Sequence, residues 1–246
     1  MTRYRLFFIV AGILLAISVL TYGIHYAAFR DTHHIFIFMV GDLGFLPLEV
    51  LLVIIVFERV LARHERHGLL QRLNVVIGSF FSEVGTHLLG ELVRCFGNGD
   101  EIRDHLAVTG EWSDGEFRKA MTYARRVTGG ADCHNIDLEE LRRFLIQKKA
   151  FLLALMQNPN LLEHERFTDL LLALFHLTEE LEARGSLQDL AEGDLQHLSG
   201  DIQRVFGLLA AEWVAYLEHL KTEYPFLFSL VVRTHPLQAC PSPTVA

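Results

Sequence analysis

The stretch GDLGFLPLEVLLVIIVFER, residues 41–59, forms most of the second of two long apolar runs near the start of this 246-residue chain. The whole second run covers 35–57. The first covers 6–28, which is 23 residues with no charged side chain apart from one histidine. A helix of that length reaches about 34 Å, enough to cross a hydrocarbon core of about 30 Å. The two runs therefore predict a transmembrane hairpin over 1–61, with spans at about 6–28 and 35–60.

A secretory signal peptide is the alternative for the first run, because Arg3 and Arg5 give it a positively charged start. The apolar part of a signal peptide has only about 7–15 residues and leads to small residues at a cleavage site. This run is longer, and its exit, Tyr26-Ala27-Ala28-Phe29, lacks the expected small-residue pattern. We interpret the first run as an uncleaved anchor.

Arginines lie on one side of the predicted hairpin. Two precede the first span, and four follow the second: Arg59, Arg63, Arg66 and Arg72. The connecting loop has only Arg30, beside Asp31. By the positive-inside rule we expect both termini in the cytoplasm, with a short hairpin tip on the other side of the membrane. The four arginines after the second span would then meet anionic lipid headgroups, so membrane lipid is an expected partner.

The net charge of −8 belongs to the part after the hairpin, where residues 62–246 carry 18 basic and 26 acidic side chains. An acidic domain of this kind excludes nucleic acid as an expected partner. The cysteines are three in number and far apart in the sequence: Cys95, Cys133 and Cys240. That spacing is typical of a reducing compartment and predicts neither a disulfide framework nor a zinc site.

The part after the hairpin reads as helical throughout. Apolar residues spaced by three and four predict a stalk helix to about residue 96, with the seam of a coiled coil or of an amphipathic helix: Leu70, Leu73, Ile77, Phe80 and Val84. The spacing then lengthens to Leu88, Leu92 and Phe96, so the seam drifts.

Local signals place the later helices. Ser113 and Glu116 have capping-box spacing and predict a helix to about Val127. Further helices are expected over 138–158, over 161–183, and from about Leu187 or Asp194 to Glu223. The apolar stretch 224–232 is too short to span a membrane, and we expect it to dock on the bundle as a short helix.

No strand pattern occurs, so the predicted fold class is all-α: a two-helix transmembrane hairpin, a long stalk helix and a cytosolic helical bundle. The predicted domains are the hairpin over 1–61, a cytosolic helical domain over 62–236 and a disordered tail over 237–246.

Three segments carry a resemblance to a known family: FRDTHHIFIFMVGDLGFLPLEVLLVIIVFERVL (29–61), IGSFFSEVGTHLL (77–89) and YPFLFSLVVRTHP (224–236). With them the chain resembles an uncharacterised family of bacterial two-span integral membrane proteins with a helical cytosolic domain. The resemblance spans most of the chain and implies that architecture, for a multi-pass protein of the bacterial inner membrane with both termini in the cytoplasm. It implies no catalytic residue, no cofactor and no substrate.

Two carboxylates, Asp42 and Glu49, fall inside the second apolar run. In one register the run is a single span, and each buried acid costs roughly 2.5–3.5 kcal/mol unless it is paired or protonated. In the other, the chain breaks at Gly41 and Gly44, and the helix starts there with Pro47 in its first turn. The two acids are then either interfacial or part of an ion- or proton-handling site, and such a site requires several copies because two helices cannot enclose a pore.

Small residues line one stripe of the first span, in two small-xxx-small pairs: Gly12, Ala16, Gly23 and Ala27. The stripe predicts a packing face, either against the second span of the same chain or in a homo-oligomer.

Thirteen histidines make metal binding a hypothesis to weigh. Two His/Glu pairs stand at i, i+4 on predicted helices, Glu83 with His87 and His176 with Glu180. A carboxylate-bridged centre in a helical bundle uses Glu-x-x-His motifs, which these pairs lack, so solvated helix faces are the plainer interpretation. No catalytic residue and no cofactor is predicted.

From the sequence we expect a membrane-tethered scaffold, adaptor or regulator that acts through protein–protein interaction, with an unknown protein partner and a potential for homo-oligomerisation. The alternative is a subunit of an oligomeric ion- or proton-conducting membrane protein that uses Asp42 and Glu49.

Overall fold

The computed structural model describes residues 2–127, 130–162, 164–238 and 241–244, without the side chains of 2–7, 59–73, 160 and 162. The chain divides into two compact units, Met1–His67 and Gly68–Ala246. The regular secondary structure of the described residues is helical. Those residues also contain one isolated β-bridge, between Phe96 and Ala131. The all-α fold class predicted from the sequence is confirmed.

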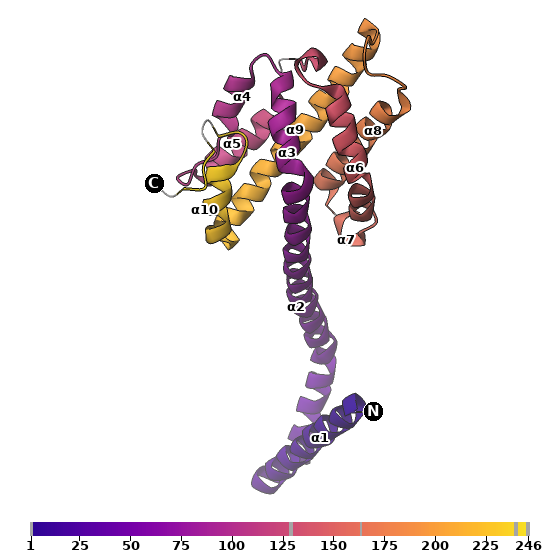
Figure 1. Ribbon diagram of the computed structural model, residues 1–246. Coiled ribbons are helices and arrows are strands. Elements are labelled where there is room, and N and C mark those ends of the chain that lie inside the picture. Colours follow the sequence, from indigo (N-terminus) through magenta and orange to yellow (C-terminus); the bar gives the residue numbers. More distant parts are fainter. Residues whose placement is uncertain (1, 128–129, 163, 239–240, 245–246) are drawn as a thin grey trace. The chain divides into compact units, whose positions relative to one another are not determined.

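The first unit consists of α1 (Thr2–Phe29) and the beginning of α2 (Thr32–Phe80), joined by a two-residue turn (Figure 1). Arg30 takes the left-handed conformation at φ 50° and donates its N–H to the carbonyl of Tyr26, 2.8 Å away. Asp31 then caps α2, because its Oδ1 accepts from the N–H groups of His33 and His34 at 2.9 and 3.2 Å. The turn is therefore fixed by local hydrogen bonds.

Two apolar segments of this unit are long enough to cross a membrane, Phe8–Phe29 with 22 residues and Thr32–Glu58 with 27. None of either segment is buried inside the protein. Large apolar side chains are exposed along both segments, for example Phe8, Leu15 and Phe57, so the two helices could span a membrane by length and composition.

In the second unit the helical path of α2 continues into the core. A π-helical turn, Phe81–Gly85, follows directly and leads into α3 (Thr86–Leu92). The hydroxyl of Thr86 donates to the carbonyl of Phe81, 2.8 Å away, across this wider turn. A π turn inserts one extra residue, so the apolar stripe moves around the helix. This turn explains why the spacing of apolar residues in the sequence changes after Val84.

Gly85 is required by the packing inside the π turn. A β-carbon at this position would lie 2.4 Å from the ring of Phe81, which is closer than real atoms approach. The Phe81 ring is itself held against Trp213 and Tyr216 of α9, with centroid distances of 4.9 and 5.3 Å. Only glycine leaves room for this arrangement.

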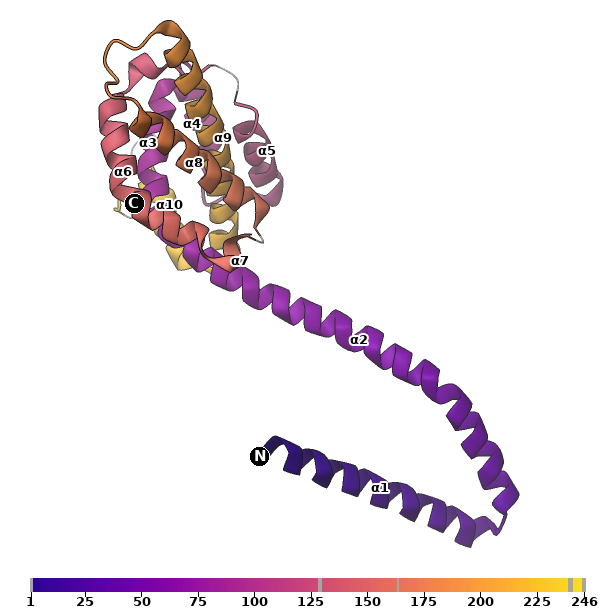
Figure 2. The same cartoon turned by 90° about the vertical axis from the view of Figure 1, so that its right-hand side faces the viewer.

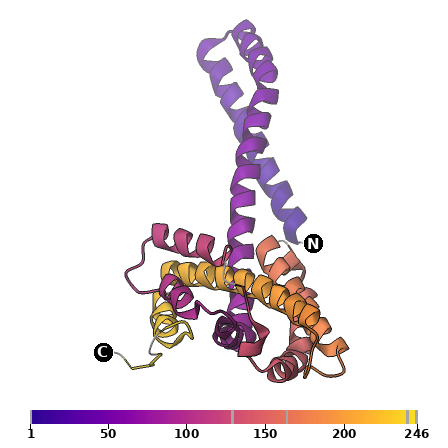
Figure 3. The same ribbon diagram turned by 90° about the horizontal axis from the view of Figure 1, so that it is seen from above.

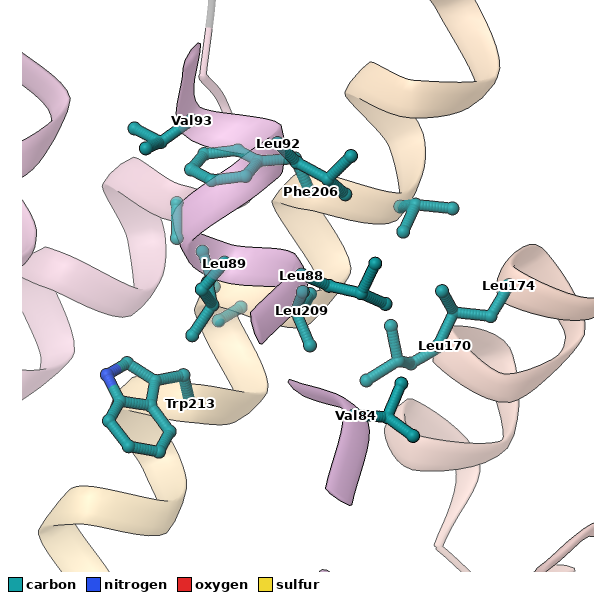
Figure 4. Close-up of a cluster of buried hydrophobic side chains, with 14 of the residues drawn as sticks. Val84, Leu88, Leu89, Leu92, Val93, Leu170, Leu174, Phe206, Leu209 and Trp213 are labelled. Carbon is teal, nitrogen blue, oxygen red and sulfur yellow. The ribbon is translucent and has the colours of Figure 1, made fainter. Parts of the chain in front are cut away.

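The long helix α9 (Glu192–Glu223) crosses the second unit and packs against α5 (Asp114–Ala124), α8 (Glu165–Ala183), α3 and α10 (Pro225–Thr234) (Figures 2 and 3). The helix α6 (Leu138–Met156) lies on the other side of α8. The core forms where α3, α8 and α9 meet, around Val84, Leu88, Leu92, Leu170, Leu174, Phe206 and Leu209 (Figure 4).

The sequence predicts an apolar seam that belongs either to a coiled coil or to an amphipathic helix. From Ile77 onward, the residues of this seam pack into the core of the second unit. Ile77, Phe80 and Val84 are each at most 3% exposed. The side chains of Leu70 and Leu73 lie outside the described residues.

Local capping signals were reliable guides to the later helices. Ser113 and Glu116 form the predicted capping box at the start of α5, and Asp137 caps α6 by accepting from the N–H groups of Glu139 and Glu140. The helix α4 (Gly99–Leu106) was not expected, because we took Gly97–Asp100 only as a helix end. Asp100 and Glu101 in its first turn favour a new helix at that point.

One predicted helix start was wrong. The helix expected over 161–183 is divided into α7 (Pro159–Leu162) and α8, whose cap is the Nδ1 atom of His164 accepting from the N–H of Phe167. Of the two starts predicted for the last long helix, Asp194 is close to the observed Glu192, whereas Leu187 lies before Asp189, which takes a left-handed conformation at φ 59° that a helix does not accommodate.

The C-terminal segment docks on the bundle as expected, through α10 and its buried Phe228. The first residues of the predicted tail, 237–246, also contact the unit. Leu237 is fully buried, and the side-chain amide of Gln238 donates to the carbonyl of Val108, 3.0 Å away. Cys240 lies outside the described residues.

His235 links this segment to the core. Its side chain is 1% exposed, its ring lies edge-on to Trp213, and its Nδ1 accepts from the N–H of Leu237, 3.2 Å away. Burial lowers the pKa of His235 to about 4, and the nearby backbone of Val108 opposes the shift to a smaller extent. The native state therefore favours the neutral imidazole.

This gives the first prediction, on the pH dependence of stability. The pKa of His235 is lower in the folded chain than in the unfolded chain. Its neutral imidazole therefore stabilises the fold fully at a pH above the pKa of the unfolded chain, and this stabilisation is lost as the pH falls toward 4. Between about pH 7 and about pH 5 the free energy of unfolding should fall by about 2 kcal/mol more in the parent than in His235→Gln. Denaturant unfolding of the detergent-solubilised full chain, followed by tryptophan fluorescence, measures this, since both tryptophans lie in the second unit. Equal losses in the two proteins would contradict it.

Candidate functional site

A polar cluster lies where α8 and α9 pack side by side (Figure 2). Each helix contributes a histidine and an acid four residues later, His176 and Glu180 from α8, and His197 and Asp201 from α9. Residues at i and i+4 share one face of a helix, so each pair projects in one direction. The residue numbers run in opposite directions on the two helices, which brings His176 to Asp201 and Glu180 to His197.

The cluster is compact. The Oδ2 atom of Asp201 lies 3.4 Å from Nε2 of His176 and 3.4 Å from Nε2 of His197. The Nε2 atom of His197 is also 3.6 Å from Oε2 of Glu180. One ligand atom from each of His176, Glu180 and His197 lies within 4.8 Å of the other two. All four side chains thus converge on one small volume.

Asp201 is the most buried member of the cluster, with 4% of its side chain exposed. Its Oδ1 accepts from Arg204, 2.9 Å away, whereas its Oδ2 has no hydrogen-bond partner in the structure. An unpartnered buried carboxylate oxygen is unfavourable unless a charge lies nearby. The two imidazoles are the groups that face it.

Glu180 is held by Arg184, which donates to its Oε2 at 2.6 Å and to Asp194 at 3.3 Å. The hydrogen bond from Arg184 holds the pKa of the Glu180 carboxyl below its usual value, with a further contribution from the charge of the same arginine. Glu180 is therefore an ionised carboxylate with a fixed orientation.

A cleft of about 880 Å³ lies between α5, α8 and α9, next to the cluster. His176 of the cluster lines this cleft, and so does Arg204, which donates to Asp201. Apolar side chains line part of it, among them Leu172, which is 51% exposed. Three arginines stand around it, Arg125, Arg166 and Arg204. The buried Glu212 lies at the same cleft, with its Oε1 3.3 Å from Nε of Arg166.

The other predicted metal candidates serve different contacts. Glu83 forms an ion pair of 2.8 Å with Lys148 of α6, and the ring of His87 packs on Phe144 of the same helix at 4.2 Å. Among the described residues, the three-residue group with metal-ligand spacing contains two of the four predicted residues, His176 and Glu180. It adds His197, and Asp201 stands beside it.

The sequence contains a signal for the two residues that we missed. His197-Leu-Ser-Gly-Asp201 repeats the spacing of His176-Leu-Thr-Glu-Glu180 on another helix. The pairing of the two motifs depends on the packing of α8 against α9, which spacing along the chain does not specify.

Asp42 and Glu49 are both exposed on α2, which is helical without interruption through Gly41, Gly44 and Pro47. The register with a chain break at Gly41–Gly44 is therefore not the one observed. An interior proline lacks one backbone N–H but is tolerated where the surrounding helix is stable.

The small-residue stripe of α1 has no covering segment among the described residues. A β-carbon added at Gly12 or Gly23 would have no neighbouring atom within 4 Å, and Ala16 and Ala27 are exposed. The side chains of the predicted lipid-facing arginines, Arg59, Arg63, Arg66 and Arg72, lie outside the described residues.

Comparison with known proteins supports the division of the chain. Residues 3–61 match the family model of the N-terminal helical domain of MJ1433, and residues 69–233 match that of its C-terminal helical domain. The chain is 43% identical to the uncharacterised protein MJ1433 of Methanocaldococcus jannaschii over 234 residues, which cover 95% of this chain and 93% of that protein. No solved structure matches. The chain therefore belongs to the MJ1433 family and matches the models of both of its helical domains.

Proposed function

We propose that the protein is a membrane-tethered helical adaptor or regulator, in which the first unit anchors the chain and the second binds a protein partner. The observation that carries the proposal is the pair of apolar helical segments, 22 and 27 residues long, of which no part is buried in the protein. Bilayer insertion would remove this apolar surface from water at a gain of roughly 25 cal/mol per Å².

The second unit has its own core, which supports a separate role for it. Side chains from α3, α5, α6, α8 and α9 are fully buried in it, for example Leu88, Leu145, Leu174 and Phe206. Anchoring by the first unit would leave the surface of the second free for binding.

The cleft between α5, α8 and α9 is the best candidate for the binding surface. The half-exposed Leu172 lines it, with three arginines and two acids: Arg125, Arg166, Arg204, Asp169 and Glu212. Arg166 pairs with Glu212 and Arg204 with Asp201, whereas Arg125 is exposed at the cleft. An exposed arginine beside apolar side chains favours a partner segment with apolar and acidic side chains. The partner we propose is a protein segment of that kind.

The second prediction tests the anchor. The full-length chain with an N-terminal tag should remain in the membrane pellet after alkaline carbonate extraction and should keep its tag, because both segments are retained and inserted. Removal of residues 1–67 should release the chain to the supernatant. A mature chain that has lost the tag would identify the first segment as a cleaved signal sequence and would contradict the proposal.

The third prediction tests the binding surface. A photo-activated crosslinking residue in place of Leu172 should yield one discrete adduct with another protein in membranes. Arg125→Glu should weaken that adduct at least several-fold by reversing a rim charge. Arg126→Glu, an identical change at the neighbouring exposed residue outside the cleft, is the matched control. An adduct that contains only a second copy of this chain, or one insensitive to Arg125→Glu, would count against the adaptor role.

An ion- or proton-conducting subunit is the second candidate function. It is favoured by Asp42 and Glu49, which are seven residues apart on a continuous helix and hence on nearly the same face, within an apolar segment. Acids in such a segment are functional-site hypotheses. Since one chain supplies only two such segments, conduction would require several copies.

The fourth prediction concerns this candidate. Proteoliposomes with the full chain should conduct protons or monovalent cations, and the double variant Asp42→Asn/Glu49→Gln should abolish the flux because it removes both charges. Glu58→Gln, at the end of the same segment, should leave the flux unchanged. No flux in the parent, or equal flux in the double variant, would exclude this function.

A further inference from the structure

We propose that His176, Glu180, His197 and Asp201 form a binding site for one divalent first-row transition metal ion. The four residues come from α8 and α9. The ligand atoms of His176, Glu180 and His197 lie within 4.8 Å of one another, Asp201 stands beside the two histidines, and His176 lines the cleft between these helices and α5. The site is independent of how the first unit is anchored.

The separations between the polar atoms fit an ion better than direct hydrogen bonds. A tetrahedral ion with bonds of about 2.0–2.1 Å to nitrogen and oxygen places neighbouring ligand atoms about 3.4 Å apart. Three of the six separations among the four residues are near this value: 3.4 Å from Oδ2 of Asp201 to Nε2 of each histidine, and 3.6 Å from Oε2 of Glu180 to Nε2 of His197. Hydrogen bonds between nitrogen and oxygen are shorter, at about 2.7–3.2 Å.

Asp201 provides a second, independent observation. Its carboxylate is almost completely buried, and its Oδ2, which faces both imidazoles, has no hydrogen-bond partner. A bound cation would satisfy that oxygen. Arg204 on Oδ1 and Arg184 on Glu180 hold the carboxylates in place as outer partners. Such outer contacts orient the ligands of many metal sites.

The ligand set indicates the class of ion. Two imidazole nitrogens and two carboxylate oxygens suit Zn²⁺ and its neighbours in the first transition row, whereas Mg²⁺ and Ca²⁺ prefer oxygen ligands alone. No thiolate belongs to the group among the described residues, so soft-metal selectivity is not expected. Histidine binds the ion in its neutral form, and binding should weaken in acid.

The two histidines make suitable variants because they are half-exposed, with 46% and 53% of their side chains accessible, so their replacement should not disturb the core. The matched control is the other His/Glu pair at i, i+4, in the double variant Glu83→Gln/His87→Asn. Those residues contact α6 and not the cluster.

The fifth prediction uses the detergent-solubilised full chain, purified with a tag that lacks histidine and stripped with a chelator. Titration with Co²⁺ should produce the visible absorption of a four-coordinate ion, saturate at one ion per chain, and be reversed by Zn²⁺. His176→Asn and His197→Asn should each weaken binding by about tenfold or more, and the double variant should lose the absorption. The control pair should bind like the parent.

A readout of unfolding separates a ligand role from a structural one. Zn²⁺ should raise the unfolding temperature of the parent and of the control pair, but not of His176→Asn/His197→Asn, because only a folded site is stabilised by its ligand. Without metal, the parent and that variant should unfold at similar temperatures. Co²⁺ binding that persists in His176→Asn/His197→Asn, or that is absent from the parent, would overturn the proposal.

Discussion

Burial of one apolar face, from Ile77 to Phe96, is the constraint on which the second unit depends. This segment enters the core as the last turn of α2, passes through the π turn and leaves as α3, and it packs against α9 and its neighbours. Phe80, Val84, Leu88 and Leu92 are fully buried. Each large-to-small change at such positions costs about 2–5 kcal/mol, a large part of the stability of a domain.

The π turn follows from that constraint. In a regular helix Leu89 would lie opposite Phe80, and Val93 opposite Val84, because nine residues make about two and a half turns. All four side chains are fully buried. One extra residue in the turn at 81–85 keeps both members of each pair in the core, and Gly85 provides the space for the ring of Phe81. The same ring contacts α9 through Trp213 and Tyr216, so the local irregularity and the position of the longest helix of the unit are coupled.

The packing of α8 on α9 has two consequences for function. It contributes to the cleft that apolar side chains and arginines line. It also places the two His/acid pairs of α8 and α9 opposite each other, next to that cleft. The match to the MJ1433 family extends over both helical domains, residues 3–61 and 69–233.

The amino-acid sequence by itself determined the features that depend on a few neighbouring residues. The two apolar runs predict two long helices because a bilayer-length apolar stretch has few other stable states, and the capping groups at Ser113 and Asp137 satisfy backbone N–H groups within three residues. The helix starts at Glu165 and Glu192 were harder to predict from the sequence. The first depends on capping by the side chain of His164, and the second follows the left-handed conformation of Asp189. Only the tertiary structure decided that His197 and Asp201 join His176 and Glu180, since the spacing on each helix is local but the meeting of two helices depends on which apolar faces are buried together.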